Sequence, residues 1–361
     1  MTNGDGEWRR TGSGRGTRRT GTGRTLTGAI ISVVVIAALL VAALFAAIGS
    51  LNRDLYSAGG FVRQYLDAIA RHDTVGALSL TGVKPTNAEL EAASLPQDLP
   101  ETLLRASVLG SLTDITLTGD TETTPGLHTV TYDFRLDGTK ASMEFQVERA
   151  GSFAGVFNAW RFSTSPLAVL QVTVLHEATF EINGLTLDAR AHAAPDAPVT
   201  FSHQAAYLAF APQRYELKHE SELLTAPTVA TPVTSSGATD VTVDAQPNAA
   251  FIQQVQDELN EFLDTCATQQ VLQPSNCPFG IDIDDRVKGL PTWSIAQYPP
   301  VTLVPGQGTF DMADTGGLAH IVVEVQSLFD GDVSVRDEDV PFAVGLTVAM
   351  NADGSLNIEL H

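Results

Sequence analysis

The sequence predicts an α+β protein: one N-terminal transmembrane helix, then two domains that each pack a helix on a curved antiparallel sheet, flanking a small all-β domain. Three observations support this. A 20-residue apolar run lies near the N-terminus, helical periodicity recurs after residues 57 and 248, and short alternating runs separated by turn dipeptides fill most of the rest. A chain of 361 residues has room for about two or three domains.

The apolar run extends from Ala29 to Ile48 and is interrupted only by the weakly polar Ser32. A helix of this length is about 30 Å long, the thickness of the hydrocarbon core of a bilayer. We therefore expect residues 26–51 to be a transmembrane helix with the lipid bilayer as its partner. A cleaved secretory signal, cut near Ala47-Ile48-Gly49, stays open as an alternative, although its apolar core would be only about 7–15 residues long.

The charges on either side of this run predict its orientation. Residues 1–25 contain six arginines against Asp5 and Glu7, a net charge of +4, whereas residues 52–361 contain 15 basic and 40 acidic residues. Basic flanks stay in the cytoplasm. We expect residues 1–25 to be a disordered, basic cytoplasmic tail at the cell membrane, and residues 52–361 to lie outside. Such an acidic outer part argues against nucleic acid as a partner.

Two cysteines, Cys266 and Cys277, predict one disulfide bond. An isolated pair in an extracytoplasmic compartment is typical of a structural bridge. Zinc would need further ligands, and a redox pair usually has C-x-x-C spacing. Pro274 and Pro278 keep the segment around Cys277 from being helical. Cys266 should lie at the end of a helix whose apolar face is formed by Phe251, Val255, Leu259, Phe262 and Cys266.

The first outer domain, residues 52–165, should begin with helices and continue with strands. Asp73 is a plausible N-cap for a short second helix that ends at Leu80. Residues 129–136 and 141–147 alternate around Asp137-Gly138, which is a strong hairpin signal. A further strand holds Trp160 and Phe162. The first helix should bury the stripe Phe61, Val62, Tyr65, Leu66 and Ile69.

The second and third domains are read in the same way. Residues 166–247 should be all-β, with a hairpin turn at Asn183-Gly184, and residues 228–246 read either as a final strand pair or as a linker. Residues 248–361 form a second α+β domain that contains the disulfide. In it, 321–325 is a candidate buried strand, and a hairpin should join 343–350 to 356–360 across residues 351–354.

Several runs resemble known families. The run Phe61–Asp73, followed by strands up to Trp160, resembles extracytoplasmic NTF2-like (lumazine-binding-like) domains. The hairpin Phe180–Gly184 with the later Ala211–Tyr215 is similar to the small β modules of teicoplanin-resistance-associated membrane proteins. The whole plan, including Cys266 to Pro278, resembles actinobacterial single-pass envelope proteins. This resemblance implies an NTF2/cystatin-like fold for the α+β domains and brings no catalytic residues.

Motifs for chemistry are missing from the sequence. It contains no G-x-S-x-G, no phosphate-binding loop and no H-E-x-x-H, since the run His219–Glu222 lacks the second histidine. We therefore predict no catalytic, cofactor-binding or metal-binding residues and no cofactor. Two acidic clusters read either as weak cation sites or as solvated loops. They are Asp282, Asp284 and Asp285, and Asp330, Asp332, Asp337, Glu338 and Asp339.

The expected function is that of a non-catalytic binding or scaffolding component of the cell envelope, with an envelope protein or a cell-wall component as partner. An alternative is a small-ligand pocket, with or without enzymatic activity, in the cone of an NTF2-like sheet. The lining of this pocket would be aromatic: Tyr65, Tyr132, Phe134, Phe145 and Trp160. The same pattern also fits side chains that simply pack in the hydrophobic core. A third hypothesis is a signalling anchor that acts through the arginine tail.

Overall fold

The computed structural model describes residues 23–192, 201–351 and 355–361. Most of the predicted cytoplasmic tail, residues 1–22, lies outside this part. The chain divides into two units, one holding the residues up to Ser57 together with Gly151–Ala159, and the other holding Ala58–Ala150 and Trp160–His361. The fold is α+β, with one N-terminal apolar helix and curved antiparallel sheets.

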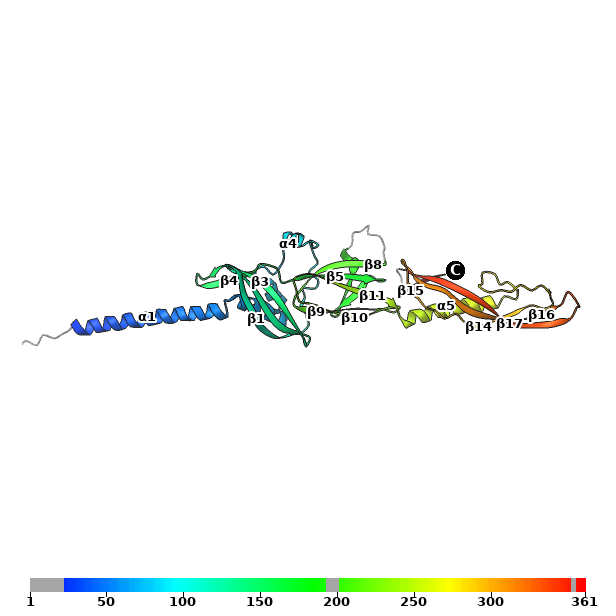
Figure 1. Ribbon diagram of the computed structural model, residues 1–361, viewed down its shortest axis with the longest axis horizontal. Coiled ribbons are helices and arrows are strands. Elements are labelled where there is room, and N and C mark those ends of the chain that lie inside the picture. Colours follow the sequence, from blue (N-terminus) through cyan, green and yellow to red (C-terminus); the bar gives the residue numbers. More distant parts are fainter. Residues whose placement is uncertain (1–22, 193–200, 352–354) are drawn as a thin grey trace, which may run out of the picture. The chain divides into compact units, whose positions relative to one another are not determined.

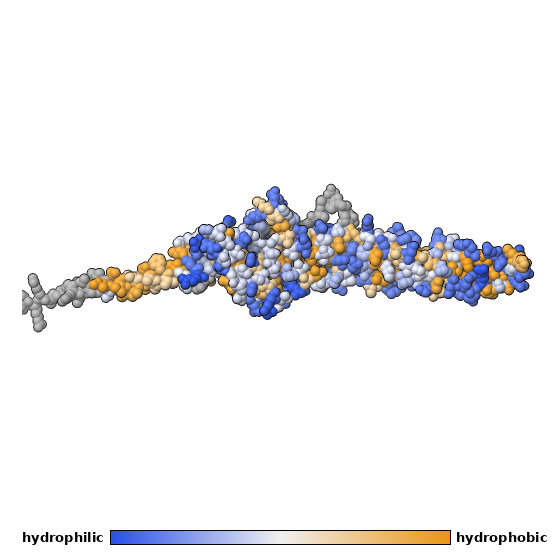
Figure 2. All heavy atoms as spheres, viewed as in Figure 1, coloured by the Kyte–Doolittle hydropathy of each residue, from blue (hydrophilic) through white to orange (hydrophobic). Residues whose placement is uncertain are grey.

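The first unit contains one long helix, α1 (Gly23–Asp54). Its side chains from Ile31 to Ala47 are all exposed, and the segment Ile31–Arg53 is long and apolar enough to cross a membrane. Figure 2 shows the described part of this helix as a hydrophobic surface. A helix that is apolar on every side suits lipid better than water, which agrees with the predicted membrane segment.

The second unit opens with short helices: α2 (Ala58–Ala70), α3 (Thr74–Ser79), α4 (Asn87–Ala92) and the 3₁₀ turn η1 (Ala106–Val108). The whole predicted stripe of α2 is buried. Asp73 caps α3 as predicted, because its carboxylate accepts a hydrogen bond from the Gly76 amide at 2.8 Å. The Asp73 cap thus fixes the start of α3, and the buried stripe packs α2 into the hydrophobic core.

That sheet has four strands in the order β1-β2-β3-β4, with bounds Leu112–Thr124, Leu127–Leu136, Thr139–Phe153 and Phe157–Phe162. The predicted Asp137-Gly138 turn joins β2 to β3, and both residues have positive φ, 46° and 82°. Only residues that tolerate this conformation fit a two-residue hairpin turn. Strand β1 was not predicted.

The middle region forms two sheets. The three-stranded sheet β11-β5-β8 has bounds Gly237–Asp244, Ala168–Leu175 and Ser202–Ala209; the five-stranded sheet β12-β10-β9-β6-β7 has bounds Gln246–Pro247, Leu224–Val233, Gln213–Glu220, Thr179–Ile182 and Leu185–Asp188. A 3₁₀ turn, η2 (Ala189–His192), follows β7. Asn183-Gly184 forms the predicted hairpin turn. Residues 228–246 are strands but not a pair, because β10 pairs with β9 while β11 runs parallel to β5.

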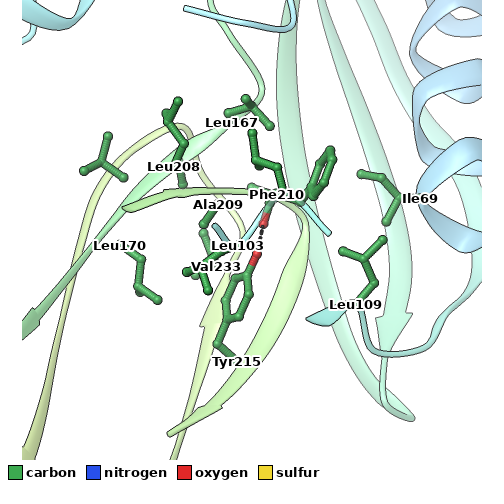
Figure 3. Close-up of a cluster of buried hydrophobic side chains, with 14 of the residues drawn as sticks. Ile69, Leu103, Leu109, Leu167, Leu170, Leu208, Ala209, Phe210, Tyr215 and Val233 are labelled. Carbon is green, nitrogen blue, oxygen red and sulfur yellow. Dashed lines mark hydrogen bonds between the residues drawn. The ribbon is translucent and has the colours of Figure 1, made fainter. Parts of the chain in front are cut away.

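One hydrophobic core joins these first two predicted regions. It extends from Ala58 in α2 to Val243 in β11. In Figure 3, Ile69 and Leu109 lie on one side of Phe210, while Leu170 and Val233 lie on the other, near Tyr215. The Tyr215 hydroxyl donates a hydrogen bond to the Phe210 carbonyl oxygen at 3.2 Å. Residues from α2 and from the middle strands therefore share one buried cluster.

A second core belongs to the third region. It packs α5 (Ala249–Ala267) against a six-stranded sheet made of β13 (Arg286–Val287), β14 (Thr292–Gln297), β15 (Val304–Pro305), β16 (Phe310–Gln326), β17 (Val333–Met350) and β18 (Leu356–Leu360). Strands β16 and β17 form a long hairpin (Figure 1). The predicted pairing of β17 with β18 is present, although residues 352–354 of its turn lie outside the described part.

Two details of this region differ from the sequence prediction. The buried face of α5 contains Leu263 where Phe262 was expected, and Phe262 is only partly buried. Segment 321–325 was expected to be a buried strand. It is a strand, but burial alternates along it and Val322 is 37% exposed. One face of β16 is therefore exposed, as is common in antiparallel sheets.

Candidate functional site

The turn between β16 and β17 is held by its own hydrogen bonds. The Ser327 amide donates to the Asp332 carbonyl oxygen at 2.9 Å, and the Gly331 amide donates to the Ser327 carbonyl oxygen at 3.1 Å. The Gln326 side-chain amide donates to the Gly331 carbonyl oxygen at 2.9 Å. Gly331 has φ 80°, a conformation that glycine adopts without strain. The turn thus presents its side chains from a defined backbone.

Apolar side chains project from this turn. Phe329 is 98% exposed, and Leu328 is 68% exposed. Val333 and Val335 lie two residues apart on one face of β17 and are 52% and 62% exposed. We call these four residues the apolar tip. Figure 2 shows orange residues among blue ones at the end of this hairpin. A phenylalanine side chain that is almost fully exposed to water contributes no hydrophobic stabilisation to the fold. Its presence at this turn therefore needs another explanation.

Acidic side chains lie near the apolar tip, together with the basic Arg286 and Arg336. Asp330 and Asp332 belong to the turn itself, and the Asp285 carboxylate accepts a hydrogen bond from the Leu328 amide at 3.3 Å. Hydrogen bonds from the Ser327 hydroxyl and the Asp332 amide lower the pKa of Asp330 from its usual value, so this carboxyl is ionised at neutral pH. Further along β17, Asp337 and Asp339 flank His320 at 3.2 Å and 2.8 Å.

Several acidic residues of the two predicted clusters have partners within the protein. Asp282 accepts a hydrogen bond from the Gln273 side-chain amide at 3.0 Å, and Glu338 pairs with Arg336 at 3.1 Å. Within the part of the chain that the structure describes, no three His, Cys, Asp or Glu side chains are grouped so as to hold a metal ion.

The predicted disulfide between Cys266 and Cys277 is formed, with a Cα–Cα distance of 5.8 Å. It ties the end of α5 to the irregular segment that leads towards β13. Nearby, the Trp293 indole donates a hydrogen bond to the Val271 carbonyl oxygen at 2.8 Å, and the Ser275 amide donates to the Gln269 side chain at 2.8 Å. The disulfide and these bonds order the segment that carries Asp285 to the apolar tip.

The five aromatic residues predicted to line a pocket are buried in the first core, with exposures of 0–9%: Tyr65, Tyr132, Phe134, Phe145 and Trp160. The Tyr132 hydroxyl donates to the Gly59 carbonyl oxygen at 2.9 Å. Tyr65 and Phe145 meet edge to face, with ring centroids 6.3 Å apart. Tyr132 thus bonds to α2, and Tyr65 and Phe145 pack against each other within this core.

A cavity of about 440 Å³ lies elsewhere in the second unit, beside α4. Its lining is mainly apolar and includes Leu90, Leu95, Leu167, Val169 and Leu208. A few polar groups, such as Ser165 and Thr164, lie at the same cavity. Small-ligand sites commonly have this combination of apolar walls and few polar groups.

Comparison with known proteins found no matching family model, no similar curated protein and no similar solved structure. Function is therefore inferred from the sites themselves. The acidic residues near the apolar tip stand out in the sequence, whereas the four residues of the tip itself were not predicted. The available signal was the pair Leu328-Phe329, two large apolar residues followed at once by Asp330-Gly331-Asp332.

Proposed function

We propose that this chain is a membrane-anchored, non-catalytic protein of the cell envelope whose outer domains bind a partner protein through the apolar tip. The proposal depends on one observation above all: Phe329, 98% exposed, projects from a turn fixed by its own hydrogen bonds. The anchor is α1, whose apolar length supports a single membrane crossing. The arginines before it favour a cytoplasmic N-terminus and an extracytoplasmic location for residues 52–361.

The chemistry of the tip favours one class of partner. Burying a phenylalanine side chain contributes about 1.5–3 kcal/mol, and aromatic anchors in fitted pockets dominate many interfaces. The carboxylates around the tip repel nucleic acid and anionic lipid and attract lysine and arginine. We therefore propose a partner protein with an apolar pocket rimmed by basic side chains.

The finer assignments of fold are part of the same proposal. Helices α2 and α3 followed by the four-stranded sheet support an NTF2-like domain at 52–165. The strands between residues 166 and 247 support a β module like that of teicoplanin-resistance-associated membrane proteins, and α5 with its sheet supports a second α+β domain at 248–361. Envelope proteins with such domains fit a binding or scaffolding role.

The first step of the test is photo-cross-linking in intact membranes. A photoreactive amino acid replaces Phe329 in one variant and Val304 in a control. Val304 is 60% exposed and lies in the same domain, beside the opposite end of β16. We expect one discrete cross-linked protein from position 329 and none from position 304. Equal cross-linking from both positions, or none from position 329, would contradict the proposal.

The second step measures affinity with the identified partner. Phe329→Ser should weaken binding by about 10–100-fold, the effect typical of an aromatic anchor. Val304→Ser should leave the affinity unchanged. Both variants should unfold at the wild-type temperature, because both side chains are mainly exposed. Binding should also weaken with salt, as expected for an acidic rim.

A second candidate function is binding of a small apolar ligand in the cavity beside α4, which its apolar lining favours. Ala93 lines this cavity and is itself exposed, so Ala93→Trp should fill the space without disturbing the core. A fluorescent fatty acid should bind the wild type and should bind this variant at least tenfold more weakly. Equal binding to both proteins would exclude the cavity.

A further inference from the structure

The turn between β3 and β4 is fastened to the end of α1 within the first unit. The Asn52 side-chain amide donates a hydrogen bond to the Val156 carbonyl oxygen at 2.8 Å. In return, the Asn158 amide donates to the Asn52 side-chain oxygen at 3.0 Å. The rings of Tyr56 and Phe157 stack with their centroids 4.5 Å apart. Two reciprocal hydrogen bonds and one ring stack thus place the turn beside the last turns of the helix.

The turn is apolar and uncharged. Residues 150–160 contain no Asp, Glu, Lys or Arg. Phe153 is 63% exposed and Val156 is 46% exposed. Beside them, Leu51 in the last turn of α1 and Leu55 just after the helix are 42% and 54% exposed. We call these four residues the juxtamembrane patch.

The length of the helix sets the depth of this patch. The apolar run Ala29–Ile48 has 20 residues. At about 1.5 Å per residue it matches the roughly 30 Å of the hydrocarbon core. Asn52, four residues further along the chain, therefore lies about 6 Å beyond the hydrocarbon, at the level of the headgroups, and so does the turn bonded to it. Tyrosine is enriched at that level, which suits Tyr56, and phenylalanine is common on the apolar face of segments that lie in the interface, which suits Phe153.

We propose that the β3–β4 turn inserts Phe153 and Val156 into the outer interface of the membrane beside the end of α1. The occupant of the juxtamembrane patch is thus the lipid surface. The patch lies directly after the apolar surface of α1, and the exposed Arg53 at the same level suits a lipid phosphate. The inference rests on the proposed anchoring by α1. Its consequence is a second lipid contact that fixes the rotation of the helix about its own axis.

Spin labels measure this depth directly. Both native cysteines are joined in the disulfide, so an introduced cysteine is the only reactive thiol. Full-length protein in vesicles of phosphatidylcholine and phosphatidylglycerol carries a nitroxide at Leu44→Cys, Phe153→Cys or Phe329→Cys. Collision with oxygen, which dissolves in lipid, is compared with collision with a water-soluble nickel complex. Position 44 is the control for the anchor, and position 329 is the control for an exposed phenylalanine with acidic neighbours.

We expect oxygen collisions to exceed nickel collisions several-fold at positions 44 and 153, and the reverse at position 329. Adding Asn52→Ala should release the turn, move the label at 153 towards water and sharpen its spectrum. A label at 153 that behaves like the one at 329, while the label at 44 stays buried in lipid, overturns the inference and leaves the anchor intact. A label at 44 that faces water overturns both.

Discussion

The Tyr65 hydroxyl in α2 donates a hydrogen bond to the Ala211 carbonyl oxygen at 2.8 Å, across 146 residues of sequence. Both groups are buried. The Ala211 carbonyl lies in the short segment between β8 and β9, so the bond joins the first helix of the second unit to the middle strands. It is the polar counterpart of the hydrophobic core that these regions share.

Removing this hydrogen bond should cost stability. Tyr65→Phe leaves the buried Ala211 carbonyl without its partner, and such a loss costs about 1–3 kcal/mol. Tyr298→Phe is the matched control, because the Tyr298 hydroxyl bonds to Asp264 at a site that is 36% exposed. Urea unfolding should show the larger loss for Tyr65→Phe. Equal losses would mean that the Tyr65 bond is replaced by water.

Alkaline pH should destabilise the second unit. Burial raises the pKa values of Tyr65 and Tyr215 above their usual value and that of Tyr207 to about 12. A raised folded-state pKa means that this stability is complete below the unfolded-state pKa of about 10 and is lost as pH rises above it. Urea midpoints between pH 9 and pH 11 should therefore fall, and Tyr215→Phe should reduce the slope. A midpoint that stays constant across this range would contradict the burial of these hydroxyls.

Two adjacent glycines in β16 should respond differently to alanine. A Cβ atom at Gly317 would lie 2.5 Å from the Phe342 ring, its cross-strand neighbour, whereas the nearest atom to a Cβ at Gly316 is 3.9 Å away. Gly317→Ala should cost about 1–3 kcal/mol through overpacking. Gly316→Ala should be neutral or slightly stabilising. Thermal unfolding of the two variants separates these outcomes, and equal melting temperatures would show that the ring moves aside freely.

Losing the disulfide should destabilise the third region. The two cysteines are 11 positions apart in sequence. In the chain-entropy model a disulfide that closes such a loop contributes about 3 kcal/mol to the free energy of unfolding. Replacing Cys266 and Cys277 together by serine should lower the unfolding free energy by that amount. The wild type in a reducing agent should match the double variant. Unchanged stability in both would show that the hydrogen bonds of Gln269 and Trp293 suffice to hold the segment.

The sequence predicted local structure correctly where particular residue types determine the backbone conformation. Asn183-Gly184 and Asp137-Gly138 are turns because their residues tolerate positive φ. The stripe of α2 and the pair Cys266–Cys277 were likewise found, since periodicity and cysteine count carry that information.

Features that depend on distant partners were not predicted. Strand β1 has one buried residue, Leu112, so its pattern gives no alternation to detect. Nothing local reveals that Tyr65 meets Ala211 or that the first two regions share a core. On α5, helical spacing alone admits both Phe262 and Leu263, and only the packed sheet selects Leu263. The apolar tip was missed because an exposed phenylalanine reads in sequence like a core residue.

The central claim is that α1 crosses a membrane with the arginine tail inside and the folded domains outside. Labelling of single cysteines in intact cells with a membrane-impermeant maleimide tests it most directly. Val75→Cys, at a position 78% exposed, should react in intact cells, whereas Ser13→Cys should react only after the membrane is permeabilised. Labelling of Ser13→Cys but not Val75→Cys in intact cells, or recovery of the protein in the medium, would contradict the account.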